Sequence, residues 1–202
     1  MLQHARSITV RQKATLNPAD SVTFCLSKGL ACPVGSVVVG SREFIWRARR
    51  ARKLLGGGMR QVGVLAAPGL LALRDGSAGM IDRLAEDHEN ARRLAEALAD
   101  MAGVVSPGDI AQPAPGRLDP GRVTTNFVVF KVERDRAAFI DALARRGVLV
   151  VGYPHGQVRA VTHYGVERAD IETTIEAFRD VLAELKPTST DQQAGTLAGA
   201  AA

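Results

Sequence analysis

The feature that most constrains the fold of this chain is the change of hydrophobic period along its second half. The segment VTTNFVVFKV at 123–132 has the β-branched and aromatic content of a strand, and DRAAFIDALARRG at 135–147 predicts a helix ended by a glycine. The strand-like segments VLVVGY and QVRAVTH follow, and then a closing helix is predicted from residue 167 to residue 185. This strand–helix–strand–strand–helix order predicts a small α/β domain at about 103–186.

The first half predicts a less complete set of elements. SVTFCLS at 21–27 and VGSVVVG at 34–40 are strand-like, and a short hairpin-like connection containing Gly29 and Pro33 joins them. Two strands leave a sheet edge exposed, so we expect an uncovered sheet edge and an uncovered helix face in this half.

Three helices are predicted after these two strands. Ser41 can cap a helix through REFIWRARRARKLL, which the glycines at 56–58 end. Pro68 is expected to kink or break the second helix. The third is a long amphipathic helix from about Met80 to Met101, whose apolar positions at helical spacing are Ile81, Leu84, Ala85, His88, Ala91, Leu94, Ala95 and Leu98.

Composition narrows the class of protein. Hydrophobic residues make up 46% of the 202, which is typical of a globular chain, and the net charge of +5 is too modest to predict nucleic-acid binding. We interpret the arginines of REFIWRARRARK as a solvated helix face. The segment 106–121 reads as a Pro/Gly-rich loop, and residues 187–202 are expected to form a disordered tail.

Neither a membrane segment nor a metal site is expected. No apolar run is long enough to cross a bilayer, and residues 1–20 lack the apolar core of a secretory signal. Cys25 and Cys32 have no metal-ligand spacing, and neither do the four histidines. We therefore expect reduced thiols in a cytoplasmic protein, with no membrane partner, no nucleic acid and no metal.

The most unusual local pattern is FCLSKGLACPVGS at 24–36, which places Lys28 between Ser27 and Gly29 just after a strand. A lysine amine held in a cleft is more often neutral, and a neutral amine can form a Schiff base with an aldehyde. The Ser27 hydroxyl could bond a cofactor group, and Gly29 lets a ligand approach the backbone. The alternative is a solvent-facing lysine in a hairpin loop.

Four segments in the same order make the chain resemble the low-specificity threonine aldolases. They are DSVTFCLSKGLACPVGSVVVGSREFI, RKLLGGGMRQVGVLAAPGLLAL, LAEDHENARRLAEAL and VRAVTH. The resemblance covers about residues 19–185 and is weakest at 104–123. It implies the C-terminal part of an aminotransferase-like (fold type I) α/β enzyme. Residues 1–78 would be a remnant of the large cofactor-binding domain, 79–102 a bridging helix, and 103–186 the small domain.

The resemblance also implies a chemistry and its residues. Enzymes of this family use pyridoxal 5'-phosphate to cleave L-threonine or L-allo-threonine to glycine and acetaldehyde. Lys28 resembles their Schiff-base lysine, Ser27 a cofactor-binding neighbour, and Arg60 a residue near the cofactor phosphate. Arg159 resembles the arginine that grips the substrate carboxylate, for which a guanidinium fork is well suited. From the sequence alone, Arg60 could instead be a surface or capping residue, and Arg159 a solvent-facing strand residue.

The family pattern has parts that this sequence does not match. Family members are longer at the N-terminus, where they carry a phosphate-binding helix start, a histidine that stacks on the cofactor ring, and an Asp-Gly-Ala-Arg strand. Residues 1–20 contain none of these motifs. We therefore expect an N-terminally truncated member with uncertain activity. The alternative is a non-catalytic remnant that serves as an interaction partner. A homo-oligomer, dimer or tetramer, is expected in the catalytic case.

Overall fold

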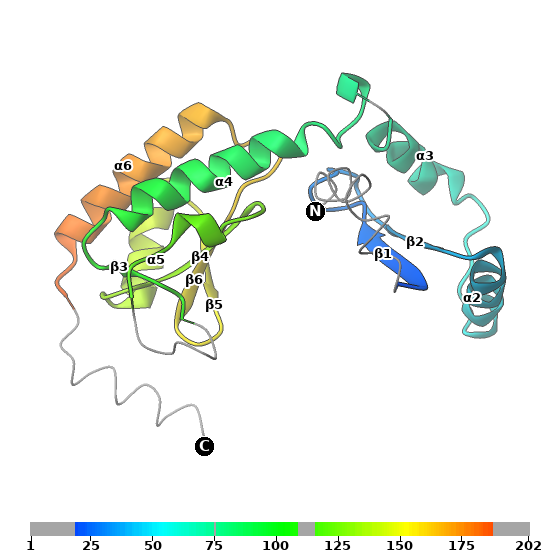
Figure 1. Cartoon of the computed structure of the whole chain (residues 1–202), viewed down its shortest axis with the longest axis horizontal. Coiled ribbons are helices and arrows are strands. Elements are labelled where there is room, and N and C mark those ends of the chain that lie inside the picture. Colours follow the sequence, from blue (N-terminus) through cyan, green and yellow to red (C-terminus); the bar gives the residue numbers. More distant parts are fainter. Residues whose placement is uncertain (1–18, 75, 109–115, 188–202) are drawn as a thin grey trace, which may run out of the picture. The chain divides into compact units, whose positions relative to one another are not determined.

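The computed structural model describes residues 19–74, 76–108 and 116–187. The chain forms two compact units, one within Met1–Glu86 and the other within Asp87–Ala202 (Figure 1). Most of the predicted irregular lead-in and of the predicted tail lies outside the described residues, as does the middle of the predicted 106–121 loop.

The first unit is built on a hairpin of two strands, as the sequence predicts. β1 (Ser21–Cys25) pairs antiparallel with β2 (Ser36–Gly40), with Ser21 opposite Gly40 and Cys25 opposite Ser36. Among the described residues of this unit no third strand pairs with them. Valine side chains lie exposed on this ribbon, among them Val22, Val38 and Val39.

Two helices follow the hairpin. α2 (Arg42–Leu54) begins where predicted, because the Ser41 hydroxyl oxygen accepts a hydrogen bond of 3.1 Å from the Phe44 amide. α3 (Gly63–Ala72) contains Pro68 within it, so the helix is not broken there, and the kink expected as the alternative stays a prediction. Proline fixes a φ that suits a helix and removes a single N–H donor. The carbonyl that loses this partner belongs to Val64, whose exposed position lets water replace the bond. A short 3-10 turn, η1 (Gly76–Ala78), comes next.

The core of the first unit is small. Its buried residues are Leu26, Leu30, Cys32, Ala72 and Leu84. α2 has no buried residue at all. Large apolar side chains remain exposed on and around both helices: Trp46, Leu54, Leu55, Met59, Val62, Val64, Leu70 and Leu71. The expectation of uncovered surface in this half is therefore confirmed for the chain by itself.

The second unit contains a four-stranded antiparallel sheet with the order β3-β4-β6-β5. Its strands are β3 (Val104–Val105), β4 (Phe127–Val132), β5 (Val151–Tyr153) and β6 (Gln157–Val161). β4 and β5 run in the same direction with β6 between them, so α5 (Arg136–Ala144) completes a split β-α-β unit. The sequence did not indicate β3 or the turn η2 (Pro120–Arg122).

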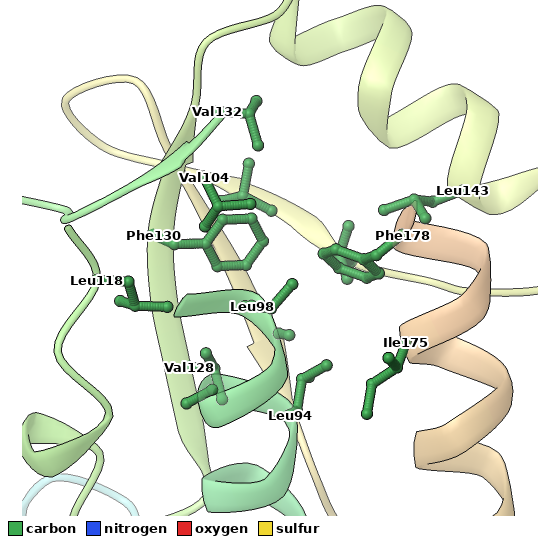
Figure 2. Close-up of a cluster of buried hydrophobic side chains, with 14 of the residues drawn as sticks. Leu94, Leu98, Val104, Leu118, Val128, Phe130, Val132, Leu143, Ile175 and Phe178 are labelled. Atoms are coloured by element: carbon green, nitrogen blue, oxygen red, sulfur yellow. The ribbon is translucent and has the colours of Figure 1, made fainter. Parts of the chain in front are cut away.

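Three helices cover one face of this sheet. Apolar side chains of α4 (Leu84–Ala99), α5 and α6 (Arg168–Glu184) join the inward residues of β4 and β6 in a single buried cluster. Figure 2 shows Leu94 and Leu98 of α4 and Phe178 of α6 in the same buried cluster as Phe130 of β4. The Phe178 ring lies 5.8 Å from that of Phe130 and 5.4 Å from that of Phe139, between centroids.

The beginning of α4 differs from the sequence prediction. The helix starts at Leu84 rather than Met80, and Ala85, predicted on its apolar face, is exposed. Two polar residues, Asp87 and Asn90, are buried instead. Asn90 donates a hydrogen bond of 2.9 Å to the Val166 carbonyl, so its burial is stabilised by a bond that hydrophobic spacing cannot indicate.

Candidate active site

Lys28 lies on a short loop of the first unit that is held in place by backbone hydrogen bonds. The Leu26 amide donates to the Gly35 carbonyl at 2.9 Å, and the Cys32 amide donates to the Leu26 carbonyl at 3.1 Å. Within this frame the Ala31 amide donates to the Lys28 carbonyl at 2.8 Å and closes a turn. Ala31 takes a φ of +53°, which is uncommon for a residue with a side chain.

One side of this loop is buried in the core and the other side is exposed. Leu26, Leu30 and Cys32 are buried in the core of the first unit, whereas Ser27 and Lys28 are exposed. The expectation that the lysine amine is sheltered is therefore not met by the described residues of this unit. Burial raises the pKa of the Cys32 thiol, which faces the core beneath the loop. The loop thus presents the amine and hydroxyl of two adjacent residues to the outside on an ordered backbone.

Arg60 lies in the turn that leads into α3. It is exposed, as are Lys53 near the end of α2 and most of the intervening glycine-rich segment. Gly56 takes a φ of +80°, a conformation that ends α2 and suits glycine. No hydrogen bond or ion pair of Arg60 to another described residue is found, so a phosphate-binding role for it stays a prediction.

Arg159 lies in the middle of β6 in the second unit. Val158 and Ala160, its neighbours along the strand, are buried in the core, so Arg159 points to the other face of the sheet. Its guanidinium carbon lies 5.4 Å from the centroid of the Phe127 ring and 5.3 Å from that of Tyr153. Both distances are within the range of cation–π attraction.

Among the described residues, the guanidinium of Arg159 has aromatic neighbours, and no carboxylate is found paired with it. Its Nε is buried and has no hydrogen-bond partner within the described part of the chain. The outward residues of β4, β5 and β6 include no acidic side chain: they are Phe127, Val129, Lys131, Val151, Tyr153, Gln157, Arg159 and Val161. A bound anion would therefore meet no competing counter-charge from these strands.

Phe127 and Tyr153 are the residues near a candidate site that sequence reasoning missed. Period-two alternation puts each on the same sheet face as Arg159 once the strand register is known. Ser27, Lys28 and Arg60 belong to the first unit and Arg159 belongs to the second, so a shared site of all four stays a prediction.

Other parts of the described chain offer weaker candidates. An open depression of about 490 Å³ is lined by the end of α4 with Asp100 after it, and by residues 117–120, which lead into η2. Its polar side chains Glu96, Asp100, Arg117 and Asp119 are surface groups, two of which already pair with one another. Across the described ranges no group of three or more His, Cys, Asp or Glu side chains could hold a metal ion. In the same ranges no helix has both the length and the apolar character needed to cross a membrane.

Comparison with known proteins places the chain in a family. The family model for beta-eliminating lyases matches residues 1–113, more than half of the sequence. The chain belongs to the beta-eliminating lyase family.

Curated relatives agree along most of the chain. The low-specificity L-threonine aldolase 1 of Arabidopsis thaliana is 35% identical over 175 residues, which are 85% of this chain and 44% of that protein. The low specificity L-threonine aldolase of Escherichia coli K12 is 42% identical over 165 residues, covering 81% of this chain and 43% of that protein. The chain thus spans less than half the length of these relatives.

A solved structure supports the fold. A pyridoxal-phosphate-dependent aminotransferase from Streptococcus suis superposes with a TM-score of 0.54 at 16% identity, over 84% of this chain and 43% of that one. At this identity the similarity concerns the fold alone. The predicted aminotransferase-like α/β class is thereby confirmed.

Proposed function

We propose that the chain belongs to a pyridoxal-phosphate-dependent lyase that splits β-hydroxy-α-amino acids, such as L-threonine and L-allo-threonine, into glycine and an aldehyde. The observation that carries the proposal is the 35% to 42% identity, over 81% to 85% of this chain, to proteins named as low-specificity threonine aldolases. Pyridoxal phosphate, when bound, supplies the electron sink for breaking the Cα–Cβ bond.

The described residues fit that cofactor in one respect. Lys28 is a primary amine on an ordered loop, open to an aldehyde, with the Ser27 hydroxyl next to it. We assign Lys28 the covalent attachment of the cofactor, Ser27 a supporting hydrogen bond, and Arg60 a charge contact with the phosphate. A shelter for the Lys28 amine must come from groups beyond the described residues of the first unit.

Arg159 is assigned the substrate carboxylate. A guanidinium with two parallel N–H donors binds a carboxylate at two points and fixes its orientation. Its position on an outward sheet face, where β4, β5 and β6 present no acidic side chain, supports this assignment. Fixing the carboxylate holds the rest of the amino acid in a defined direction, and orientation is a large part of catalysis in such reactions.

The test combines cofactor attachment with turnover. The purified chain is incubated with pyridoxal phosphate, reduced with borohydride and digested, and the pyridoxyl group is located by mass spectrometry. Attachment at Lys28 is expected, with loss in Lys28→Arg and retention in the matched variant Lys53→Arg. Release of acetaldehyde from L-allo-threonine is measured in parallel. Equal labelling of Lys28 and Lys53, without acetaldehyde, would contradict the proposal.

A second role is favoured by the exposed apolar surface of the first unit. Side chains such as Leu54, Leu55 and Leu70 are more than 70% exposed, and exposed apolar surface of this kind, where it is contiguous, marks an interaction site. We propose a homo-oligomer, dimer or tetramer, for the catalytic case, and an interaction partner of a full-length aldolase for the non-catalytic alternative. Sedimentation of the chain alone, and then mixed with a complete relative, separates these cases.

The cellular location is also a proposal. Cys25 and Cys32 are both free thiols, which supports a reducing compartment and hence the cytoplasm. A fluorescently tagged chain that fractionates with membranes or the cell exterior would contradict it.

A further inference from the structure

We propose that Phe127 and Tyr153 are positioning residues that hold the guanidinium of Arg159 ready for a carboxylate ligand. The proposal rests on the proposed role of Arg159 in binding the substrate carboxylate. It adds two residues whose action is on the arginine rather than on the substrate.

The first argument is the strand register. Arg159 lies opposite Val129 on β4 and opposite Val151 on β5. Phe127 lies two residues along β4 in one direction, and Tyr153 lies two residues along β5 in the other. The two rings therefore flank Arg159 on diagonally opposite sides, at nearly equal distances of 5.4 and 5.3 Å. Diagonal neighbours on one sheet face are close enough for long side chains to touch.

The second argument is that hydrogen bonds next to each ring fix its place. Beside Phe127, the Asn126 side-chain amide donates to the Thr162 carbonyl at 2.8 Å, and the Thr162 amide donates to the Asn126 carbonyl at 3.1 Å. At the other ring, a guanidinium nitrogen of Arg136 donates to the Tyr153 carbonyl at 3.0 Å. The backbone that carries each ring is therefore held in place by hydrogen bonds.

The third argument concerns what the arginine lacks. A guanidinium is usually oriented by a carboxylate or by carbonyl groups, and such partners would occupy the donors that a ligand needs. Here no hydrogen-bond partner reaches the Arg159 Nε within the described residues, and the two rings are the neighbours that restrain it. Aromatic faces attract the cation without using its N–H groups. The arginine is thus held in place while, as far as the described residues are concerned, its Nη donors remain available for two-point binding.

NMR spectroscopy can test this proposal by measuring the side-chain signal of Arg159 directly. The full chain is labelled with ¹⁵N, and the Arg159 Nε–Hε signal is assigned with Arg159→Lys. Ring currents from the neighbouring aromatic side chains should displace this signal. We expect it to move toward the value of a free arginine in Phe127→Leu and Tyr153→Leu, but not in Phe127→Tyr or Tyr153→Phe. Val151→Ala removes an apolar neighbour directly opposite Arg159 and should leave the signal unmoved.

The same samples are then titrated with glycine and, separately, with acetate. We expect each carboxylate to shift the Arg159 signal, and loss of either ring to weaken glycine binding about two- to fivefold, as expected for a partly exposed cation–π contact. The ring-retaining variants should bind as the unchanged chain does. Core methyl signals show whether each variant is folded; Phe127 and Tyr153 are 46% and 39% exposed, so folding should survive their replacement.

The outcomes separate the two proposals. If glycine and acetate leave the Arg159 signal unchanged in the original chain, the carboxylate role fails, whatever the rings do. If the carboxylates bind but the leucine variants neither move the signal nor weaken binding, the positioning role is overturned and the proposed function stands. Weaker binding in Val151→Ala equal to that in the leucine variants would also overturn it, since general loss of packing would then explain the effect.

Discussion

The guanidinium of Arg93 in α4 and the carboxylate of Glu172 in α6 meet at two points. Nε donates to Oε1 at 2.7 Å, and Nη2 donates to Oε2 at 3.2 Å. This pairing joins two helices that are 79 positions apart in sequence. The hydrogen bond from Arg93 lowers the pKa of the Glu172 carboxyl below its ordinary value of 4.5. Both side chains are nearly half exposed, so the stabilisation is expected to be small.

The lowered pKa of Glu172 determines how the stabilisation by this ion pair depends on pH. A carboxyl that binds protons less readily when folded stabilises the fold above its unfolded pKa, and this stabilisation is lost as the pH falls through the folded pKa. In Glu172→Gln we expect a lower urea midpoint at pH 7, and a difference from the original chain that shrinks below about pH 4.5. Glu176→Gln, an exposed carboxyl on the same helix, serves as control. A constant difference from pH 7 to pH 3 would contradict this assignment.

The core of the second unit should be sensitive to loss of Phe178. Its ring is fully buried and contacts the rings of Phe130 and Phe139. Replacing it with alanine leaves a large cavity, so we expect Phe178→Ala to lower the free energy of unfolding by about 3–5 kcal/mol. Phe178→Leu keeps most of the volume and should cost clearly less. Equal losses in both variants, measured by urea unfolding, would show that the site collapses around the cavity.

The start of α5 depends on a side-chain cap. Asp135 Oδ1 accepts a hydrogen bond of 2.7 Å from the Ala138 amide, one of the free donors of the first helical turn. Asp135→Ala should therefore destabilise the chain by about 1 kcal/mol, while Asp135→Ser should retain most of the stability. Thermal unfolding of the two variants at the same pH checks this. A serine variant as unstable as the alanine variant would argue against the cap.

The two thiols should react at different rates. Cys32 is buried and its pKa is raised by that burial, whereas Cys25 is half-buried on β1. Because the thiolate is the reactive form, Cys32 should react more slowly with Ellman's reagent at pH 8. Cys25→Ser should remove the fast phase and Cys32→Ser the slow one. In urea the two phases should merge; two phases that persist there would point to a cause other than folding.

Local signals made much of the second unit predictable. The Asp135 cap and Gly147, which takes a φ of +79° after α5, mark the two ends of that helix in the sequence. Both depend on a few neighbouring residues, as does the Ser41 cap of α2. The order of the strands in the sheet could not be predicted from such local signals. The placement of β6 between β4 and β5 is a pairing between distant segments, and it is this pairing that brings Phe127 and Tyr153 to Arg159.

The surroundings of Lys28 are a second feature that local sequence signals could not predict. The sequence around it predicted the hairpin-like connection, but the burial of Leu26 and Leu30 beside it is a finding of the structure, and no local pattern states what covers a loop. Shelter depends on groups that are remote in sequence, and those in the described part of the first unit leave the amine exposed. That α3 continues through Pro68 has a related reason, since the cost of the missing N–H depends on whether water can reach the carbonyl of Val64.

The alternation along β6 links the hydrophobic core to the candidate ligand-binding face. Val158 and Ala160 point inward and Arg159 points outward, because successive residues of a strand face opposite ways. Inserting or deleting a single residue in this strand would drive the arginine into the core and expose a valine in its place. In evolution, length changes should therefore accumulate in the turn at 154–156 and be rejected within the strand, because any shift that spoils recognition also spoils folding.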